Sequence, residues 1–476
     1  MRLGRVMVAI VAVGLLLSAP GRAHAQDTRP NIVFVLTDDL STDLIRHMPA
    51  VRRLQRDGVS ASRFIVDSSL CCPSRSSILT GKLPHNTKVL SNFYPLGGYA
   101  RFMEAGNARS TFASSLQAAG YRTALFGKFL NGYDPRTNTP LPGFDEWLAT
   151  GGAGAYDGYG YTLNDNGIPR YFTSEFINVT LADRARAFID TWAGRQPFVL
   201  EVATTTPHAP FAWASRDDGR FTHLKVPRRG AYDQPVVNPP GWLRYRPPLT
   251  PGKRRHLDEV LRRRVRAVQS VNRLVAALRK RLRERGVEGS TYFVFSSDNG
   301  LHIGQHRLTP GKRTAFDTDI RVPLVVAGPG LPAGRTTGVL AQNTDLRPTF
   351  EAMAGLDPSP DVDGIDLLPH LQDPFAAGGR GAALVEYSND APSPGVGDAD
   401  SQSRAAGLPP DYTALRLPDA TYVEDADGDR EYYDLARDPH QRVNRYAALS
   451  PAQRASLAAR LAALRACRGA AQCAAP

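Results

Sequence analysis

Cys71 opens a segment whose residue types could perform nucleophilic chemistry. Residues 71–81 read CCPSRSSILTG, in which Pro73 fits the first turn of a helix and Gly81 fits its end. Cys71 is therefore expected just before a helix N-terminus, where free backbone N–H groups and the helix dipole favour an anion. These features predict an activated thiol. The alternative is that Cys71 and Cys72 are a pair of small buried side chains.

Acidic and amide side chains follow two apolar, strand-like segments, at 31–37 and 292–297. These side chains are Asp38, Asp39, Asp298 and Asn299. In open α/β sheets ligands bind at the carboxyl ends of the strands, so both groups are expected at one sheet edge. Oxygen ligands suit a hard divalent cation, calcium or magnesium, rather than zinc. Each Asp could instead be a helix N-cap or a turn residue.

Two further strand-like segments end in residues suited to anion binding and proton transfer. Residues 121–127 lead into Lys128, and residues 197–203 lead towards His208 in the sequence TPHAP. A single lysine is usually a surface charge, and a single histidine is usually a structural residue. Because both would reach the sheet edge that carries the acids, we interpret Lys128 as an anion-binding group and His208 as a proton-transfer group.

Apolar, β-branched runs alternate with helical patterns along most of the chain. This alternation predicts an α/β fold with a large mixed, mostly parallel sheet flanked by helices. The clearest predicted strands are 31–37, 123–126, 197–203, 291–296 and 322–327. The clearest predicted helix, 254–285, has Leu and Val at helical spacing. Arginines and lysines fill its other face, which we interpret as a solvated helix surface.

The C-terminal part predicts a smaller α+β domain with a short antiparallel sheet. Its expected elements are strands at 383–387, 412–417, 420–424 and 431–435 and a final helix at 451–466. We therefore divide the chain after residue 25 into a large domain at 26–372, which carries the candidate catalytic residues, and a smaller C-terminal subdomain at 373–476. Two irregular stretches, 208–254 and 391–410, are expected to be loops, and the first is expected to line a binding site.

The N-terminus has the layout of a secretory signal peptide. Basic residues within 1–5 precede an apolar run at 6–17 and a small-x-small site that ends at Ala25. The apolar run is too short to span a hydrocarbon layer of about 30 Å. We expect cleavage after Ala25 and a secreted or periplasmic protein with no stable membrane anchor. An N-terminal membrane anchor or a buried helix is the alternative.

Charge and cysteine content add two constraints. The formal net charge is +12, and +9 remains once residues 1–25 are removed. A basic surface would attract anionic substrates, although an arginine-rich genome would produce the same charge. No basic run with interleaved aromatic residues indicates nucleic-acid binding. Cys467 and Cys473 predict a small disulfide near the C-terminus, whereas a bridge between the adjacent Cys71 and Cys72 would be badly strained.

Residues 71–81 resemble the signature of the type I sulfatases, which belong to the alkaline-phosphatase superfamily. The match to C-x-P-S-R-x-x-x-L-T-G is highly specific, and further similarity extends from 30–32 through 363–364 to 433–439. The chain is most similar to the N-acetylglucosamine-6-sulfatases and the extracellular heparan endosulfatases, because it shares the doubled cysteine and the segments TGKLPHN, GKFLN and SDNGLHIG. The resemblance implies an alkaline-phosphatase-like fold.

The resemblance also implies a modified residue and a metal site. Cys71 would be oxidised to formylglycine during maturation by a formylglycine-generating enzyme. Calcium, with magnesium as the other candidate, would be held by the modified Cys71 together with Asp38, Asp39, Asp298 and Asn299. One hydroxyl of the hydrated aldehyde would attack sulfur, and deprotonation of the other would release the sulfate.

The remaining roles follow from the same resemblance. Arg75 would support the hydrated aldehyde, and Lys128 and Lys312 would bind the sulfate oxygens. His208 would protonate the leaving alcohol, and His302 would contact the sulfate or the nucleophile. These roles imply hydrolysis of a sulfated carbohydrate or an aryl sulfate.

One position departs from many arylsulfatases, which carry a histidine two residues after the strand-end lysine. This chain has Leu130 there, as the glucosamine-6-sulfatase branch does. The role of that histidine in breaking down the covalent intermediate must pass to another base or to Asn131.

Two alternative functions stay open at the level of the sequence. A phosphonate or phosphate ester hydrolase would fit, because relatives with the same C-x-P-S-R motif cleave those substrates. A catalytically silent carbohydrate-binding protein, in which Cys71 stays unmodified, belongs to a different class.

Overall fold

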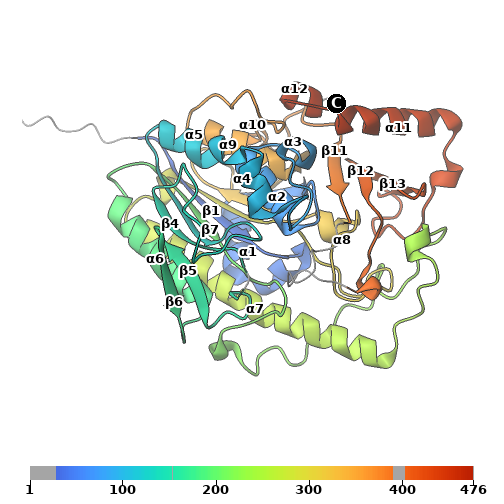
Figure 1. The fold of residues 1–476 in the computed structure, drawn as a ribbon, viewed down its shortest axis with the longest axis horizontal. Helices are drawn as coiled ribbons and strands as arrows, with labels where there is room; N and C mark the ends of the chain where they lie inside the picture. The colour runs from blue at the N-terminus through green and yellow to red at the C-terminus, as the bar shows by residue number, and fades with distance from the viewer. Residues whose placement is uncertain (1–27, 153, 390–402, 475–476) are drawn as a thin grey trace, which may run out of the picture.

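A large mixed sheet forms the centre of the computed structural model, which describes residues 28–152, 154–389 and 403–474 (Figure 1). In spatial order its ten strands are β10 (Arg335–Gln342), β2 (Val59–Ile65), β9 (Leu324–Ala327), β8 (Thr291–Ser297), β1 (Asn31–Thr37), β7 (Phe198–Ala203), β3 (Arg122–Lys128), β4 (Glu146–Thr150), β5 (Tyr161–Asp165) and β6 (Ile168–Phe172). The five strands predicted for this sheet are all present, with β9 starting at Leu324 rather than at residue 322.

The middle of the sheet is parallel. β1 pairs in parallel with β7 and β8, and β3 pairs in parallel with β7 and β4. Antiparallel pairing is confined to β9, which lies between β8 and β2, and to the β4–β5–β6 edge. The prediction of a mixed, mostly parallel sheet is therefore confirmed, and β1, β3, β7 and β8 all end at the same edge.

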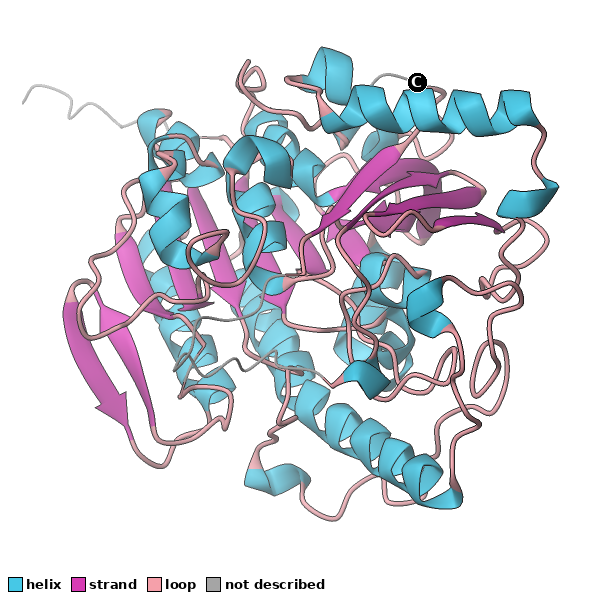
Figure 2. Cartoon of the chain, turned by 45° about the vertical axis from the view of Figure 1, so that its right-hand side comes forward, coloured by secondary structure: helices cyan, strands magenta, loops and turns pink. Residues whose placement is uncertain are grey.

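Helices cover both faces of the sheet (Figures 1 and 2). One face carries α1 (Pro49–Asp57), α6 (Ile177–Trp192) and α7 (Pro251–Glu284), and the other carries α2 (Cys71–Thr80), α3 (Pro84–Thr87), α4 (Gly98–Glu104), α5 (Phe112–Ala118), α9 (Leu346–Met353) and α10 (Leu368–Gln372). Side chains of a strand alternate between the two faces. Accordingly, Ile32 and Phe34 belong to one buried core cluster, and Val33 and Val35 belong to the other.

A second sheet of four antiparallel strands follows in the chain. Its strands are β11 (Ala383–Tyr387), β12 (Tyr412–Leu417), β13 (Ala420–Asp425) and β14 (Arg430–Asp434), and the helices α11 (Pro451–Arg465) and α12 (Ala470–Cys473) end the described chain. The predicted antiparallel sheet and the Cys467–Cys473 disulfide are confirmed. Ala383 and Val385 join the core cluster of the main sheet, so the two sheets pack together. The domain boundary after Gln372 falls between β10 and β11 and stays a prediction.

Two predicted segments lie wholly or mostly outside the residues that the structure describes. Among the described residues, no helix has the length and apolar character needed to cross a membrane. The predicted signal peptide, 1–25, and most of the predicted loop at 391–410 lie outside the described residues. The other predicted loop, 208–254, contains only short 3₁₀ turns before α7 begins at Pro251.

Candidate active site

The carboxyl ends of four neighbouring parallel strands bring the predicted polar residues together. β1 ends before Asp38 and Asp39, β8 before Asp298, β3 at Lys128, and β7 shortly before His208. All five side chains are buried, none being more than 2% exposed. The strand-end prediction thus places acids, a lysine and an imidazole at one sheet edge, as expected for an open α/β sheet.

Helix α2 brings Cys71 to the same edge as its first residue. Its start is fixed by the Ser74 hydroxyl, which donates to the carbonyl oxygen of Asp298 at 2.6 Å. Its end is at Gly81, whose φ of 70° is the left-handed conformation expected of a glycine that terminates a helix. The predicted helix is therefore present, with Cys71 in its first turn and Cys72 also a free thiol.

Three of the predicted residues contact the Cys71 sulfur directly. The Lys312 ammonium lies 2.9 Å from Sγ, and the thiol lies 3.4 Å from Asp38 Oδ1 and 3.6 Å from Asn299 Oδ1. Cys71 itself is fully buried. A nucleophile formed at this position would have the Lys312 cation beside it and the oxygens of Asp38 and Asn299 around it.

The acids and bases of the site form three buried ion pairs. Lys128 pairs with Asp38 and Lys312 with Asp39, each at 2.8 Å, and Arg75 pairs with Asp298 at 2.7 Å. Arg75 also donates to the backbone carbonyl of Lys128 at 2.8 Å. Buried charges are tolerated when they are paired and hydrogen-bonded, so these contacts hold six ionisable groups in fixed positions.

Neighbouring charges set the ionisation of two of these groups. Burial disfavours the charged form of Lys128, but the adjacent Asp38 and Cys71 outweigh it and raise the pKa of Lys128 well above its ordinary value. Burial would also raise the pKa of Asp298, but Arg75, followed by Lys128 and Lys312, lowers it below its usual range. The site therefore keeps a cationic lysine and an anionic Asp298 at neutral pH.

His208 faces the acid cluster from the loop after β7. Its Nε2 atom lies 3.8 Å from Asp39 Oδ2, and its Nδ1 atom lies 2.6 Å from the carbonyl oxygen of Ala209. Tyr156 stacks on the imidazole, with ring centroids 4.1 Å apart, and also lies under the Lys128 ammonium at 5.3 Å. The Nδ1 contact and the stacked ring fix the orientation of the imidazole and direct Nε2 towards the site.

His302 is oriented differently from the prediction that it contacts the sulfate or the nucleophile. Its Nδ1 atom lies 2.9 Å from Asp319 and its Nε2 atom 2.8 Å from the carbonyl oxygen of Ala406. Both ring nitrogens are therefore occupied away from Cys71. The backbone of His302 instead forms a two-way bridge with Gly311, next to Lys312, so in this geometry it positions the lysine-bearing loop.

The acid cluster brings together donor atoms that could hold a metal ion. Oxygens of Asp38 and Asp39, the Cys71 sulfur and a nitrogen of His208 all lie within 4.8 Å of one another. Asp298 lies beside this group, where one oxygen faces Arg75 and the other accepts the backbone N–H groups of Asp39 and Asn299. Together with the neighbouring Asp298 and Asn299, these side chains could hold a metal ion.

Leu130 lies two residues after Lys128, and Asn131 follows it. Leu130 is fully buried in the core cluster that includes Phe129 and Tyr133. The Asn131 backbone carbonyl accepts the N–H of Tyr99.

Two residues at the site were not found by the sequence analysis. Tyr156 lies in a segment rich in glycine and tyrosine, at 151–161, whose composition predicts only a loop. Arg264 lies within the arginine-rich face of α7 but is fully buried, and its guanidinium donates to the backbone carbonyl of Asp39. Asp39 has a φ of 61°, which is a strained backbone conformation for a non-glycine residue. The hydrogen bond from Arg264 stabilises this conformation. The prediction that this face of α7 is solvated is therefore wrong for Arg264.

An open cavity of about 450 Å³ leads to the buried cluster. Its floor includes Asp39, His208 and Lys312, and its walls include Ala209 to Phe211 together with His256 and Arg263 of α7. The loop that begins at His208 therefore contributes its first residues to the wall, as predicted. A cavity of this size admits a small molecule or the end of a larger one.

The fold and the site together define a hydrolase of the alkaline-phosphatase-like class. A sequence model of the sulfatase family matches residues 30–356, and the chain belongs to the sulfatase family. It is a sulfuric ester hydrolase, as the names of its relatives indicate.

The comparisons with individual proteins agree with this assignment. Human N-acetylglucosamine-6-sulfatase is 32% identical, and the match covers 93% of this chain and 85% of the human protein. A structure solved in complex with its substrate, D-glucosamine-2-N,6-O-disulfate, has a TM-score of 0.76 at 21% identity and covers 92% of this chain and 97% of its own. A phosphonate monoester hydrolase from Silicibacter pomeroyi has a TM-score of 0.69 at 22% identity, with coverages of 90% and 93%.

Proposed function

We propose that this protein removes a sulfate ester from a sulfated amino sugar, with a formylglycine derived from Cys71 as its nucleophile and calcium as its metal. The observation that carries the proposal is the placement of the Cys71 sulfur among Lys312, Asp38 and Asn299 at one sheet edge. The similarity to a human protein named N-acetylglucosamine-6-sulfatase, over most of both chains, supports the class of substrate.

The modification explains why a cysteine is placed there. A formylglycine-generating enzyme would act on the chain before folding is complete, since Cys71 is fully buried in the folded protein. As a hydrated aldehyde, the residue offers two hydroxyl groups on one carbon, one for attack on sulfur and one whose deprotonation expels the sulfate. A serine or an unmodified cysteine has no second hydroxyl for that release.

The charged groups around Cys71 would stabilise the transition state. Asp38, Asp39, Asp298, Asn299 and the modified Cys71 would hold calcium, which supplies Lewis-acid stabilisation of a sulfate oxygen when bound. Lys128 and Lys312 would contact other sulfate oxygens, and Arg75 holds Asp298 and the end of β3 in place. Fixed charges in a site that excludes water stabilise such a transition state by several kcal/mol.

His208→Ala tests the assignment of the leaving-group acid. Since proton donation matters most when the departing alcohol is poor, turnover of a sugar sulfate is expected to fall about 10²–10⁴-fold. The loss on 4-nitrophenyl sulfate, whose phenolate leaves readily, is expected to be much smaller. The measurement is kcat/KM for both substrates, with His223→Ala as a control, because His223 is an exposed histidine of the same loop. Equal losses on both substrates would remove His208 from this role.

Parallel assays distinguish the proposed sulfatase activity from the two alternative functions. We expect release of sulfate from N-acetylglucosamine 6-sulfate, with weaker turnover of 4-nitrophenyl phenylphosphonate. A preference for the phosphonate ester would favour the phosphonate hydrolase, a class represented among the structural neighbours. Binding of the sugar without turnover of any ester, in protein whose Cys71 is unmodified, would favour a silent carbohydrate-binding protein.

A secreted or periplasmic location accompanies this function. The signal-peptide pattern at residues 1–25 supports it. The Cys467–Cys473 disulfide supports it independently, because disulfides persist in oxidising compartments.

A further inference from the structure

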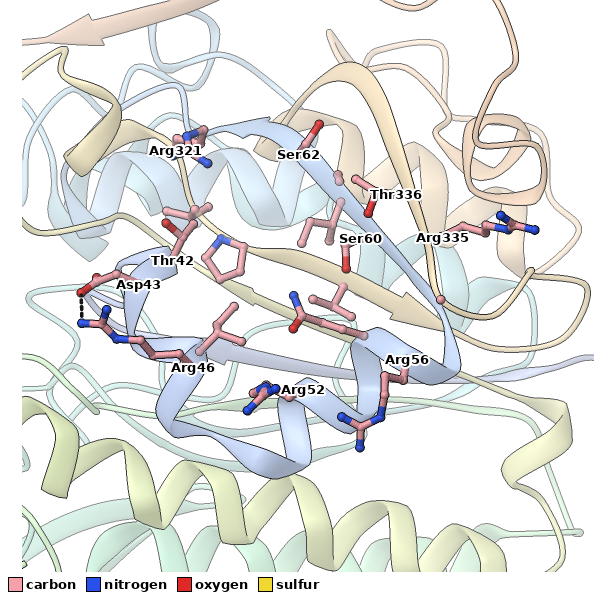
Figure 3. Close-up of a pocket in the computed structure, with 18 residues that line it drawn as sticks. Thr42, Asp43, Arg46, Arg52, Arg56, Ser60, Ser62, Arg321, Arg335 and Thr336 are labelled. Carbon is pink, nitrogen blue, oxygen red and sulfur yellow. Dashed lines mark ion pairs between the residues drawn. The ribbon is translucent and has the colours of Figure 1, made fainter. Parts of the chain in front are cut away.

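A second, larger hollow of about 730 Å³ lies apart from the buried cluster around Cys71. One wall is formed by α1 and the 3₁₀ turn before it, Thr42–His47. The opposite wall is formed by β2, β9 and the start of β10 (Figure 3). We call this hollow the arginine groove, because five arginines line it: Arg46, Arg52, Arg56, Arg321 and Arg335.

The groove carries a strong excess of positive charge. Among the described residues that line it, Asp43 is the only acid, and it pairs weakly with Arg46 at 3.8 Å. Arg321 pairs with Asp317 at 3.2 Å. Within the described chain, the exposed guanidinium groups of Arg52, Arg56 and Arg335 have no ion pair with any acid.

The sequence of α1 indicates that this charge does not serve the fold. Val51 and Leu54 supply the buried face of the helix, while Arg52 and Arg56 are four residues apart on the side towards the groove. Like charges at this spacing destabilise a helix by a few tenths of a kcal/mol. Arg335, from a distant part of the chain, adds a further cation to the same hollow (Figure 3).

The lining chemistry fits sulfate or carboxylate groups carried on a sugar chain. Guanidinium groups bind such groups through paired hydrogen bonds. The hydroxyls of Ser60 and Thr336 line the groove between the arginines (Figure 3). In the part of the chain that the structure describes, no aromatic residue lines the groove, so these residues offer no surface on which nucleic-acid bases could stack.

The groove is a neighbour of the active-site cavity. A smaller hollow of about 260 Å³ lies between the two. It shares Asp43, Arg46 and Arg321 with the arginine groove, and it shares Leu301 with the cavity that contains Lys312. The three hollows therefore share lining residues in series, from the arginine groove to the cavity that contains Lys312.

We propose that the arginine groove is a second binding site for a sulfated polysaccharide, which it holds by sugars remote from the sulfate being hydrolysed. The inference rests on the proposed function for the class of ligand. This second site makes the enzyme selective for long anionic chains, because a single sugar cannot reach both sites. Neutralising several anionic groups releases counterions, so binding of long chains depends steeply on salt.

The test compares two triple variants that remove the same charge. R52Q/R56Q/R335Q alters the groove, and R109Q/R136Q/R468Q alters three exposed arginines elsewhere. Fluorescence anisotropy measures the Kd of a heparin dodecasaccharide and of a heparin disaccharide over a range of salt. For the dodecasaccharide we expect the groove variant to raise Kd at least tenfold and to lower the slope of log K against log salt by about two. The disaccharide Kd is expected to stay unchanged, as is every value for the control variant.

Three outcomes would overturn the proposal. The first is a groove variant that binds the dodecasaccharide as the native protein does, and the second is an equal loss in the control variant. The third is equal groove-dependent binding of single-stranded DNA or of phosphatidylserine vesicles, which would show a general polyanion surface. Turnover of 4-nitrophenyl sulfate, expected to be equal in all three proteins, reports folding. If the native protein releases sulfate neither from 4-nitrophenyl sulfate nor from N-acetylglucosamine 6-sulfate, the proposed function is refuted and the binding result still stands.

Discussion

Cys71→Ser is expected to abolish steady-state turnover of 4-nitrophenyl sulfate, with a loss of at least about 10⁴-fold, because the serine hydroxyl has no partner hydroxyl on the same carbon to release the bound sulfate. A single round of attack remains chemically open to serine. The variant is therefore expected to trap sulfate on the protein or to remain inert.

Folding of this variant is checked directly. Serine is close in size to cysteine and keeps a polar atom between Lys312 and Asp38, so the thermal midpoint is expected to stay within a few degrees of the native value. Cys72→Ser is the matched control, because the neighbouring thiol is also buried but belongs to the core cluster rather than to the ion pairs. Full steady-state activity in Cys71→Ser would refute the proposed nucleophile.

Removal of the metal is expected to give the second largest effect. Chelation should lower kcat/KM about 10²–10³-fold, because Lewis-acid stabilisation worth several kcal/mol is lost. Calcium is expected to restore activity, and zinc is not. Without the divalent cation, Asp38 and Asp39 keep Lys128 and Lys312 as partners, so the fold is expected to persist.

Asp38→Asn assigns this effect to the site. It removes one carboxylate from the group of donor atoms and is expected to lower bound calcium, measured by elemental analysis, in parallel with activity. Asp183→Asn is the control, because Asp183 is exposed and its ion pair is with the exposed Arg186. Native calcium content and activity in Asp38→Asn would exclude this carboxylate from the metal site.

The sequence predicts most accurately the bounds of strands whose side chains are buried on both sides. β1, β11 and β12 have the predicted boundaries, and the runs of β1 and β11 are almost wholly apolar. β2 was not predicted, since its sequence VSASRFI is half polar and its burial comes from strands distant in the chain. β5 and β6 were missed as well, although the Asn166-Gly167 turn between them, with both φ angles positive, is a hairpin signal that could have revealed them.

The predicted site residues come together where strand direction alone fixes their place. Asp38, Lys128 and Asp298 lie at the ends of parallel strands, so the sequence pattern and the sheet topology are enough to predict that they meet. His302 lies in a loop, and its partners Asp319 and Ala406 are set by tertiary packing that no local pattern encodes. Arg264 was hidden for a similar reason, since one buried arginine within a charged helix face has the same sequence pattern as its solvated neighbours.

The oxidation state of residue 71 in active protein tests the account most directly. Mass spectrometry of the peptide that contains Cys71, taken from enzyme that turns over 4-nitrophenyl sulfate, measures it. We expect a mass below the encoded one by the conversion of –CH₂SH to –CHO, in a fraction of molecules that matches the active fraction. An unmodified cysteine in fully active enzyme would contradict the account.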